Sequence, residues 1–281
     1  MARFEAITGK YVYITVQGVE YRAYFEENGK GIPLLCQHTA GAESLQWRHL
    51  MNDEEVTSKF RVIAADLPYH GKSLPPGSIE WWKQEYRLTK SFFIDFLLEL
   101  SRALGLDKPV FIGCSMGGHL ALDLALECPD DFRAVIGVES AEYTPGFNMI
   151  WWDHPRISGE VKSANLYEST SPYGPENYRR EVGWVYGKSA PPVFKGDLYY
   201  YSVEHDLTGK LGQIDTSRIP VYIFCGEYDI ASTPEQGRQA ASQIKGAKFT
   251  EMKKLGHFPV TENYEMCRKY LMPVLKEIAG A

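Results

Sequence analysis

The chain has 281 residues, of which 44% are hydrophobic and 23% are charged, and its 30 basic and 36 acidic residues give a net charge of −6. This length is enough for one large domain with an insertion. The sequence contains no basic block, so neither nucleic acid nor an anionic membrane is an expected partner. The N-terminus lacks the apolar core of a signal peptide, and no apolar run approaches the roughly 20 residues of a membrane span. We therefore expect a cytoplasmic protein.

The cysteines and histidines indicate neither disulfides nor a metal site. The five cysteines are odd in number, far apart and mostly set in apolar patterns, as is typical of buried free thiols in a reducing compartment. No Cys-x-x-Cys pair occurs, and the seven histidines do not form a His-Glu-x-x-His motif. The cysteines are Cys36, Cys114, Cys128, Cys225 and Cys267.

The first hundred residues predict an antiparallel pair followed by alternating strands and helices. Strands are expected at 11–17, 21–25, 33–36 and 60–65, a turn at 26–31, and helices at 45–51 and 86–104. Strands that alternate with helices indicate an α/β fold with a mostly parallel, doubly wound sheet.

Residues 108–128 form the stretch on which the functional prediction depends. An apolar run at 109–112 predicts a buried strand, and a helical pattern extends from Gly118 to Cys128. Between them, Gly113-Cys-Ser-Met-Gly117 fits G-x-S-x-G, a sharp turn that lifts a serine above the sheet. The sequence therefore predicts a nucleophile elbow at Ser115, with a helix-capping serine as the alternative.

After a strand at 132–138 the alternation stops, and it resumes only near residue 210. Residues 141–209, here called the cap insertion, contain 13 of the chain's Phe, Trp and Tyr residues, which is unlike a polar linker. We predict a helical, loop-rich cap on a core formed by 1–140 and 210–281. Further elements are expected as strands at 218–226 and 247–252, a helix that begins at Thr233-Pro234, and a helix at 261–277.

A serine nucleophile needs a base within hydrogen-bond reach and a third group that orients the base. His257 follows the last predicted strand and Asp229 the penultimate one, so both lie at the sheet edge that carries Ser115. The order Ser, acid, His is the order that accompanies this elbow. We predict Ser115, His257 and Asp229 as the catalytic residues. Glu139, at the end of the strand after the elbow, is the rival acid, and Glu227 ranks below both.

A tetrahedral oxyanion needs two backbone donors. One is expected to be the N–H of Met116, directly after the nucleophile, and the other the N–H of Thr39 or Ala40 in the loop after Cys36. His38 in that loop is expected to brace it rather than to act as a catalyst.

These motifs resemble the α/β-hydrolase-fold serine hydrolases over essentially the whole chain. The resemblance rests on 113–118, on Asp66-Leu-Pro-Tyr-His-Gly-Lys-Ser73, on Gly226-Glu-Tyr-Asp229 and on Gly256-His257. It implies the fold, the triad and no cofactor. The family usually has Gly where Thr39 and Tyr69 stand. We therefore expect Tyr69 and His70 either to project into the substrate pocket or to pack within the protein. From the cap insertion we expect Trp151, Trp152 and Trp184 to line that pocket.

The reaction predicted first is hydrolysis of an ester or related acyl bond of a small, largely apolar or aromatic substrate. Carbon–carbon bond hydrolases of ring-fission products share the triad but tend to have Asn before the serine and Trp after the histidine, where this chain has Cys114 and Phe258. Haloalkane dehalogenases and epoxide hydrolases need Asp at position 115. A third alternative is a non-catalytic ligand binder or receptor. The expected partner is a small molecule, and the aromatic cap insertion could pair with a second copy.

Overall fold

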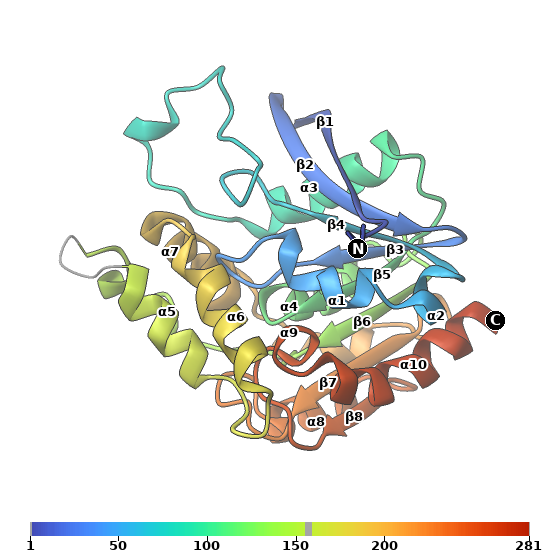
Figure 1. The fold of residues 1–281 in the computed structure, drawn as a ribbon. Helices are drawn as coiled ribbons and strands as arrows, with labels where there is room; N and C mark the ends of the chain where they lie inside the picture. Colours follow the sequence, from blue (N-terminus) through green and yellow to red (C-terminus); the bar gives the residue numbers. More distant parts are fainter. Residues whose placement is uncertain (1, 155–158, 281) are drawn as a thin grey trace.

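A computed structural model describes residues 2–154 and 159–280 and shows an eight-stranded sheet with helices on both faces (Figure 1). The strand order is β1-β2-β4-β3-β5-β6-β7-β8. The β1–β2 and β2–β4 pairs are antiparallel and the other pairs are parallel, which confirms the predicted fold class. The strands are β1 (Thr8–Val16), β2 (Val19–Gly29), β3 (Ile32–Gln37), β4 (Phe60–Ala65), β5 (Val110–Cys114), β6 (Ala134–Val138), β7 (Val221–Gly226) and β8 (Lys248–Met252).

Strand β2 is longer than predicted, and the turn expected at 26–31 is wrong for 26–29. These residues continue the strand because they pair with β4, from Glu26 opposite Ala64 to Gly29 opposite Arg61. The acidic residues that suggested a turn serve as ion-pair partners within the sheet. Glu27 contacts Lys10 at 2.6 Å and Arg61 at 2.7 Å on the two neighbouring strands.

The helices of the core cover the two faces of the sheet. Helices α3 (Lys90–Ala103), α4 (Met116–Glu127) and α8 (Pro234–Gln243) pack on one face. Helices α1 (Arg48–Met51), α2 (Glu54–Thr57) and α10 (Tyr264–Gly280) pack on the other face. The helix predicted at 86–104 begins only at Lys90, because the Thr89 hydroxyl caps it by accepting the Phe92 N–H at 3.3 Å. The remaining short helices are η1 (Ser44–Trp47), η2 (Trp81–Lys83) and α9 (Pro259–Glu262).

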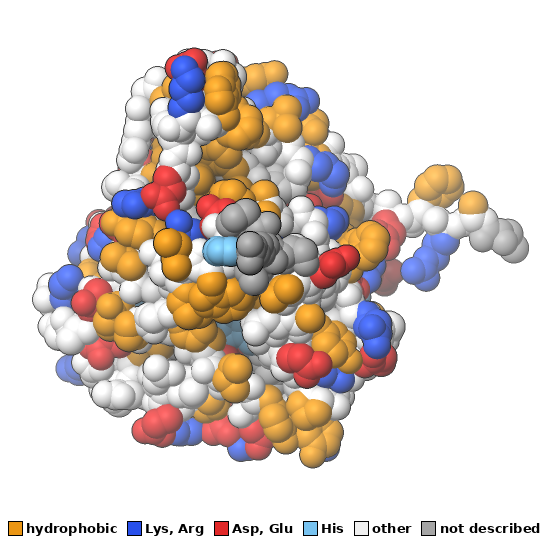
Figure 2. Space-filling model, turned by 90° about the vertical axis from the view of Figure 1, so that its left-hand side faces the viewer, with side chains coloured by type: hydrophobic (Ala, Val, Ile, Leu, Met, Phe, Trp, Pro, Cys, Tyr) orange, Lys and Arg blue, Asp and Glu red, His pale blue; other side chains and the backbone are white. Residues whose placement is uncertain are grey.

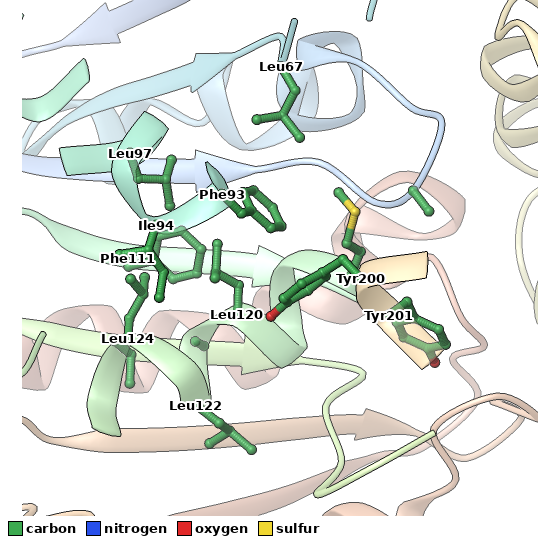
Figure 3. Packing of buried hydrophobic residues seen from close by; sticks show 14 of the residues in the cluster. Leu67, Phe93, Ile94, Leu97, Phe111, Leu120, Leu122, Leu124, Tyr200 and Tyr201 are labelled. Atoms are coloured by element: carbon green, nitrogen blue, oxygen red, sulfur yellow. The ribbon is translucent and has the colours of Figure 1, made fainter. Parts of the chain in front are cut away.

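The two hydrophobic clusters follow from the alternation of side chains along buried strands. In β4, Val62 and Ala64 belong to one cluster, whereas Ile63 and Ala65 belong to the other. Figure 3 shows part of the latter, in which Phe93 of α3 and Leu120 of α4 pack beside Tyr200. Their burial holds the elbow helix against the sheet.

The cap insertion leaves the sheet after β6 and returns at β7. Figure 1 shows its helices α5, α6 and α7 together at one side of the molecule. An isolated antiparallel bridge between Tyr143 and Asp206 joins the outgoing and returning segments at the base. The elements of this part are η3 (Ile150–Asp153), α5 (Gly159–Glu168), α6 (Glu176–Gly187), α7 (Pro191–Tyr199) and the π-helical turn η4 (Tyr200–Glu204). The short helix η5 (Leu211–Gln213) follows the cap insertion and precedes β7.

Across residues 2–154 and 159–280, no helix combines the length and the apolar character that a membrane span requires. The five cysteines are free thiols, and all except Cys128 are buried.

Candidate active site

The turn from β5 to α4 places Ser115 in a conformation that few residues adopt. Its φ of +54° lies in the left-handed region, and its N–H donates to the Val138 carbonyl at 2.8 Å. The turn is tight enough that a Cβ at Gly113 would lie 2.3 Å from the Gly117 backbone, and one at Gly117 would lie 2.8 Å from the Gln37 carbonyl oxygen. Glycine at both positions is therefore a steric requirement of this elbow.

The structure brings Ser115, His257 and Asp229 together from three strand ends. Ser115 Oγ lies 2.8 Å from His257 Nε2, and His257 Nδ1 lies 2.8 Å from Asp229 Oδ2. The second contact is close, but its angle lies outside that of a hydrogen bond. Asp229 Oδ1 accepts the N–H groups of Ala231 at 2.7 Å and Ser232 at 3.2 Å, which fixes the carboxylate.

Glu139, the rival acid, lies next to Asp229 as the second member of a buried carboxyl pair. Both of its side-chain oxygens are 2.9 Å from the Gly226 N–H. Burial raises the pKa of Glu139 well above its usual range, and the Asp229 carboxylate raises it further. Burial also acts to raise the pKa of Asp229, but the attraction of His257 and hydrogen bonds from Glu139 and the Ala231 N–H lower it on balance. These opposite directions favour Asp229 as the charged member of the pair and Glu139 as the protonated one.

Glu227, the lowest-ranked acid, points away from this cluster. Its exposed carboxylate accepts the Lys254 N–H at 2.9 Å and contacts the Lys253 ammonium at 3.3 Å.

Glu262 of α9 is a residue that no sequence motif singled out. It holds the loop that carries His257. Its fully buried carboxylate accepts the backbone N–H groups of Gly256, Ser171 and Phe258, the latter two at 3.2 Å and 3.4 Å. Burial raises the pKa of Glu262 to about 7. An acidic residue in the first turn of a helix just after the histidine was the available signal.

Two backbone N–H groups remain as candidates for an oxyanion hole. Met116 is the first residue of α4, where an N–H has no acceptor within the helix. Ala40 lines the same cavity as Ser115. The Thr39 N–H donates to Gln46 Oε1 at 2.8 Å, so the expectation that Thr39 could serve is wrong and Ala40 is the candidate.

His38 braces the loop, because both of its ring nitrogens have backbone partners. Nδ1 donates to the Thr39 carbonyl at 2.8 Å, and Nε2 accepts the Leu67 N–H at 3.2 Å. Burial lowers the pKa of His38 to about 3, which keeps the ring neutral.

A cavity of about 280 Å³ includes Ser115 and His257 and is walled mostly by apolar side chains of the cap insertion. Trp151 and Trp152 stack at 3.8 Å between ring centroids, and Trp152 meets Phe194 edge-on at 4.9 Å. Figure 2 shows hydrophobic side chains gathered on this face of the molecule. The other lining residues are Ala40, Phe147, Met149, Asn165, Leu166, Glu168, Ser169, Tyr186, Leu198, Tyr201, Ile230 and Ala231.

Three residues expected in the pocket lie elsewhere. Tyr69 packs against Tyr86 at 4.8 Å and lines a separate cavity, and His70 is buried against Asp197 at 2.7 Å. Trp184 is 70% exposed on α6. The expectation failed there because residues two positions apart face nearly opposite sides of a helix, and α6 presents Tyr186 to the cavity instead.

Tyr201, on the π-helical turn η4, is another pocket residue that the sequence did not single out. Its hydroxyl lies 3.0 Å from Ser232 Oγ and also interacts with the hydroxyls of Thr144 and Ser115. It provides a polar group beside the nucleophile in an otherwise apolar wall. Within the described part of the chain, no group of three or more His, Cys, Asp or Glu side chains could hold a metal ion.

Comparison with known proteins gives the same fold. A family model of the alpha/beta hydrolase fold matches residues 32–166. A 2-hydroxymuconate semialdehyde hydrolase of Pseudomonas sp. (strain CF600) is 27% identical over 144 residues, which cover 49% of this chain and 48% of that protein. An uncharacterized carboxylesterase of Bacillus subtilis (strain 168) is 22% identical over 236 residues, which cover 80% of this chain and 73% of that protein. The chain spans about half the length of the first curated relatives it matches.

Among solved structures, a thermophilic esterase from Thermogutta terrifontis superposes with a TM-score of 0.82 at 21% identity, covering 96% of this chain and 99% of that one. At this identity the likeness concerns the fold alone.

Proposed function

Because this protein has the α/β-hydrolase fold, we propose that it is a serine hydrolase acting on a carboxylic ester or a related acyl bond of a small, largely apolar or aromatic substrate. One observation carries the proposal. Ser115 Oγ lies 2.8 Å from His257 Nε2, and both residues line an apolar cavity of about 280 Å³. Asp229 contacts the imidazole on its other side. The names of the Bacillus and Thermogutta proteins support ester substrates.

In the proposed acylation step, Ser115 Oγ attacks the substrate carbonyl carbon while its proton passes to His257 Nε2. Asp229, which remains ionised, stabilises the imidazolium that forms. The developing oxyanion accepts hydrogen bonds from the N–H groups of Met116 and Ala40. The tetrahedral intermediate collapses when His257 gives its proton to the leaving alcohol, which leaves an acyl group on Ser115.

Deacylation reverses these roles with water as the nucleophile. His257 removes a proton from water, the hydroxide adds to the acyl carbon, and the proton returns to Ser115 as the acid leaves. No cofactor takes part in either step.

The cavity wall indicates the kind of substrate. Aromatic and aliphatic side chains together make most of the wall, so an apolar or aromatic group gains the most from burial there. Tyr201 and Asn165 provide polar groups that can orient a substrate by hydrogen bonding.

Hydrolysis of a carbon–carbon bond is the second candidate, because the Pseudomonas relative is named a 2-hydroxymuconate semialdehyde hydrolase. The residues next to Ser115 and His257 in the sequence favour ester hydrolysis over cleavage of a carbon–carbon bond. Cys114 precedes the serine and its buried thiol faces the His257 carbonyl oxygen, while Phe258 follows the histidine and packs on Tyr186.

The test is a panel of p-nitrophenyl esters of graded acyl length together with a ring-fission dienoate. We expect hydrolysis of the esters and a kcat/KM for the dienoate that is lower by at least tenfold. Turnover of the dienoate alone would favour the second candidate. Absence of turnover, combined with tight binding of an apolar ester by both the wild type and Ser115→Ala, would favour a non-catalytic binder.

A further inference from the structure

Asp197 on α7 of the cap insertion is a fully buried carboxylate that contacts three separate segments of the core. Its Oδ2 accepts the Gly41 N–H at 2.6 Å and lies 2.7 Å from His70 Nε2. Its Oδ1 accepts the Tyr86 hydroxyl at 3.0 Å. The steps described above for ester hydrolysis do not use this residue.

The contact with Gly41 bears on the candidate oxyanion hole, because Gly41 directly follows Ala40. On the other side of Ala40, the Thr39 N–H donates to Gln46 of the core. The peptide that carries the Ala40 N–H therefore lies between two peptides whose N–H groups are held by side chains. The Thr39 hydroxyl also contacts the Tyr186 hydroxyl of α6, a second contact between this loop and the cap insertion.

The packing leaves no room for another side chain between α7 and this loop. Gly41 has a φ of +65°, and a Cβ there would lie 2.7 Å from the Phe194 ring. Two residues further along α7, a Cβ at Gly196 would lie 2.2 Å from the Tyr86 ring. Since α7 approaches the core through two glycine contacts, small shifts of α7 are transmitted to the loop.

The oxygens of Asp197 face donors from every partner, including the imidazole of His70. His70 Nδ1 is 2.9 Å from the Pro68 carbonyl oxygen and Nε2 faces Asp197, so both nitrogens meet acceptors and the ring holds two protons. Burial acts to lower the pKa of His70, but the attraction of Asp197 raises it on balance. The other charged or titratable groups that face this pair are His38, Asp66, Tyr86 and Lys162. The Asp197 oxygen that accepts the Gly41 N–H thus also contacts His70, so one atom of the cap insertion joins two segments of the core.

We propose that Asp197 is a positioning residue for the reaction: from the cap insertion, it holds the 39–41 loop so that the Ala40 N–H points to the oxyanion that forms above Ser115. The proposal rests on the proposed function, and it implies that the cap insertion completes the catalytic machinery as well as the pocket wall.

The test compares Asp197→Ala with the wild type on the best ester of the panel. We expect kcat to fall about 10- to 100-fold, less than or comparable to the loss of one oxyanion donor, with KM changed less than threefold. The affinity for an alkyl boronic acid, which forms a tetrahedral adduct with Ser115, should fall by the same factor as kcat. The affinity for the unreactive amide analogue of the ester should stay within twofold.

Two matched variants separate positioning from general stabilisation. Tyr86→Phe removes only the contact to Oδ1 and should keep kcat within threefold of the wild type. Asp123→Ala removes another buried carboxylate that contacts a histidine and a tyrosine, His205 at 2.8 Å and Tyr200 at 2.6 Å, away from the 39–41 loop. Its other oxygen lies 3.7 Å from the Lys90 ammonium. It should lower the unfolding temperature as Asp197→Ala does and leave boronate affinity unchanged.

A folded Asp197→Ala with wild-type kcat and boronate affinity would overturn the proposal, as would an equal loss of boronate affinity in Asp123→Ala. If Asp197→Ala does not fold, Asp197→Asn is measured instead. Its amide oxygen can still accept the Gly41 N–H without the charge, so a three- to tenfold fall in kcat is expected and unchanged kcat contradicts the idea. If the wild type hydrolyses no ester, the proposed function fails, and Asp197 is judged on the rate at which a fluorophosphonate labels Ser115 in each variant.

Discussion

Ser115 and Cys114 are adjacent residues with opposite surroundings. The Ser115 hydroxyl contacts His257 and opens into the cavity, whereas the Cys114 thiol is fully buried and burial raises its pKa well above the usual range. A thiol that does not ionise is a poor nucleophile. We expect Ser115→Ala to lower kcat by about 10⁴- to 10⁶-fold, as the loss of a nucleophilic serine does elsewhere.

Labelling with a fluorophosphonate, read by intact-protein mass spectrometry, checks this assignment. Cys114→Ala should label like the wild type and Ser115→Ala should not label. Labelling that persists without Ser115 would refute the assignment of the nucleophile.

Asp229 and Glu139 are in contact, yet we expect their substitution to change kcat by very different factors. Asp229→Asn removes the charge next to His257 and should lower kcat by about 10⁴-fold. Glu139→Gln keeps an oxygen for the Gly226 N–H and a donor toward Asp229. Since one neutral hydrogen bond is worth about 0.5–1.5 kcal/mol, the loss in kcat should be about tenfold at most.

Steady-state kinetics on both variants decide between the two acids. The assignment is reversed if Glu139→Gln is the inactive variant and Asp229→Asn retains most of its turnover.

For single residues, the sequence predicted which side chains meet when each of them directly follows a strand of the sheet. Ser115, Asp229 and His257 each follow a parallel strand, and such ends share one edge of a sheet. Asp197 and Glu262 could not be found in this way, because each also has a partner that is distant in the chain and lies in a loop without a fixed register. This partner is Gly41 for Asp197 and Ser171 for Glu262. The Thr39 N–H was unavailable because of Gln46, seven residues away, and no local pattern signals that contact.

The helices of the cap insertion determine the shape of the pocket, and two tryptophans in that part of the chain give matched variants. Trp151 lines the cavity and stacks on Trp152, whereas Trp184 is 70% exposed on α6. Trp151→Ala should enlarge the cavity and raise the ratio of kcat/KM for a long over a short acyl ester by about tenfold. Trp184→Ala should leave this ratio unchanged.

The graded ester panel measures both ratios. An unchanged preference in Trp151→Ala, or an equal change in Trp184→Ala, would show that the cavity described here does not hold the acyl chain.

The strands and core helices were predictable because their burial follows a period of two or of about 3.6 residues. Strand β4 matches its predicted bounds at Phe60–Ala65, and the helix after Thr233 begins where Pro234 was expected to open it. Helix α6 of the cap insertion carries aromatic residues on more than one side, so composition could not tell which side of the helix faces Ser115. Trp184 and Tyr186 show this difference.

In the whole molecule, the buried pair of His70 and Asp197 makes the joining of the cap insertion to the core depend on pH. The pKa of His70 is raised in the folded protein, so its stabilising effect is fully present below the ordinary value near 6.5 and is lost as pH rises through the raised value. Removing one partner of a buried ion pair costs about 3–5 kcal/mol. We expect His70→Gln to lower the unfolding temperature most at acidic pH, and less as pH rises.

Thermal unfolding of the wild type and His70→Gln from pH 5 to pH 9 provides the measurement. A difference between the two unfolding temperatures that is constant across this range would contradict the charged state of the pair.

The narrow base of the cap insertion has a consequence for how such proteins diversify. The segment leaves and rejoins the sheet at neighbouring strands, β6 and β7, and the Tyr143–Asp206 bridge pairs its two ends. Such a base allows one insertion to be exchanged for another, by recombination or by design, without cutting the sheet. A transplanted insertion would, however, arrive without Tyr186 and Asp197, and the 39–41 loop would lose both of these contacts. New substrate ranges obtained in this way should therefore come with slow turnover until the replacement regains a hydroxyl and a carboxylate at those two places.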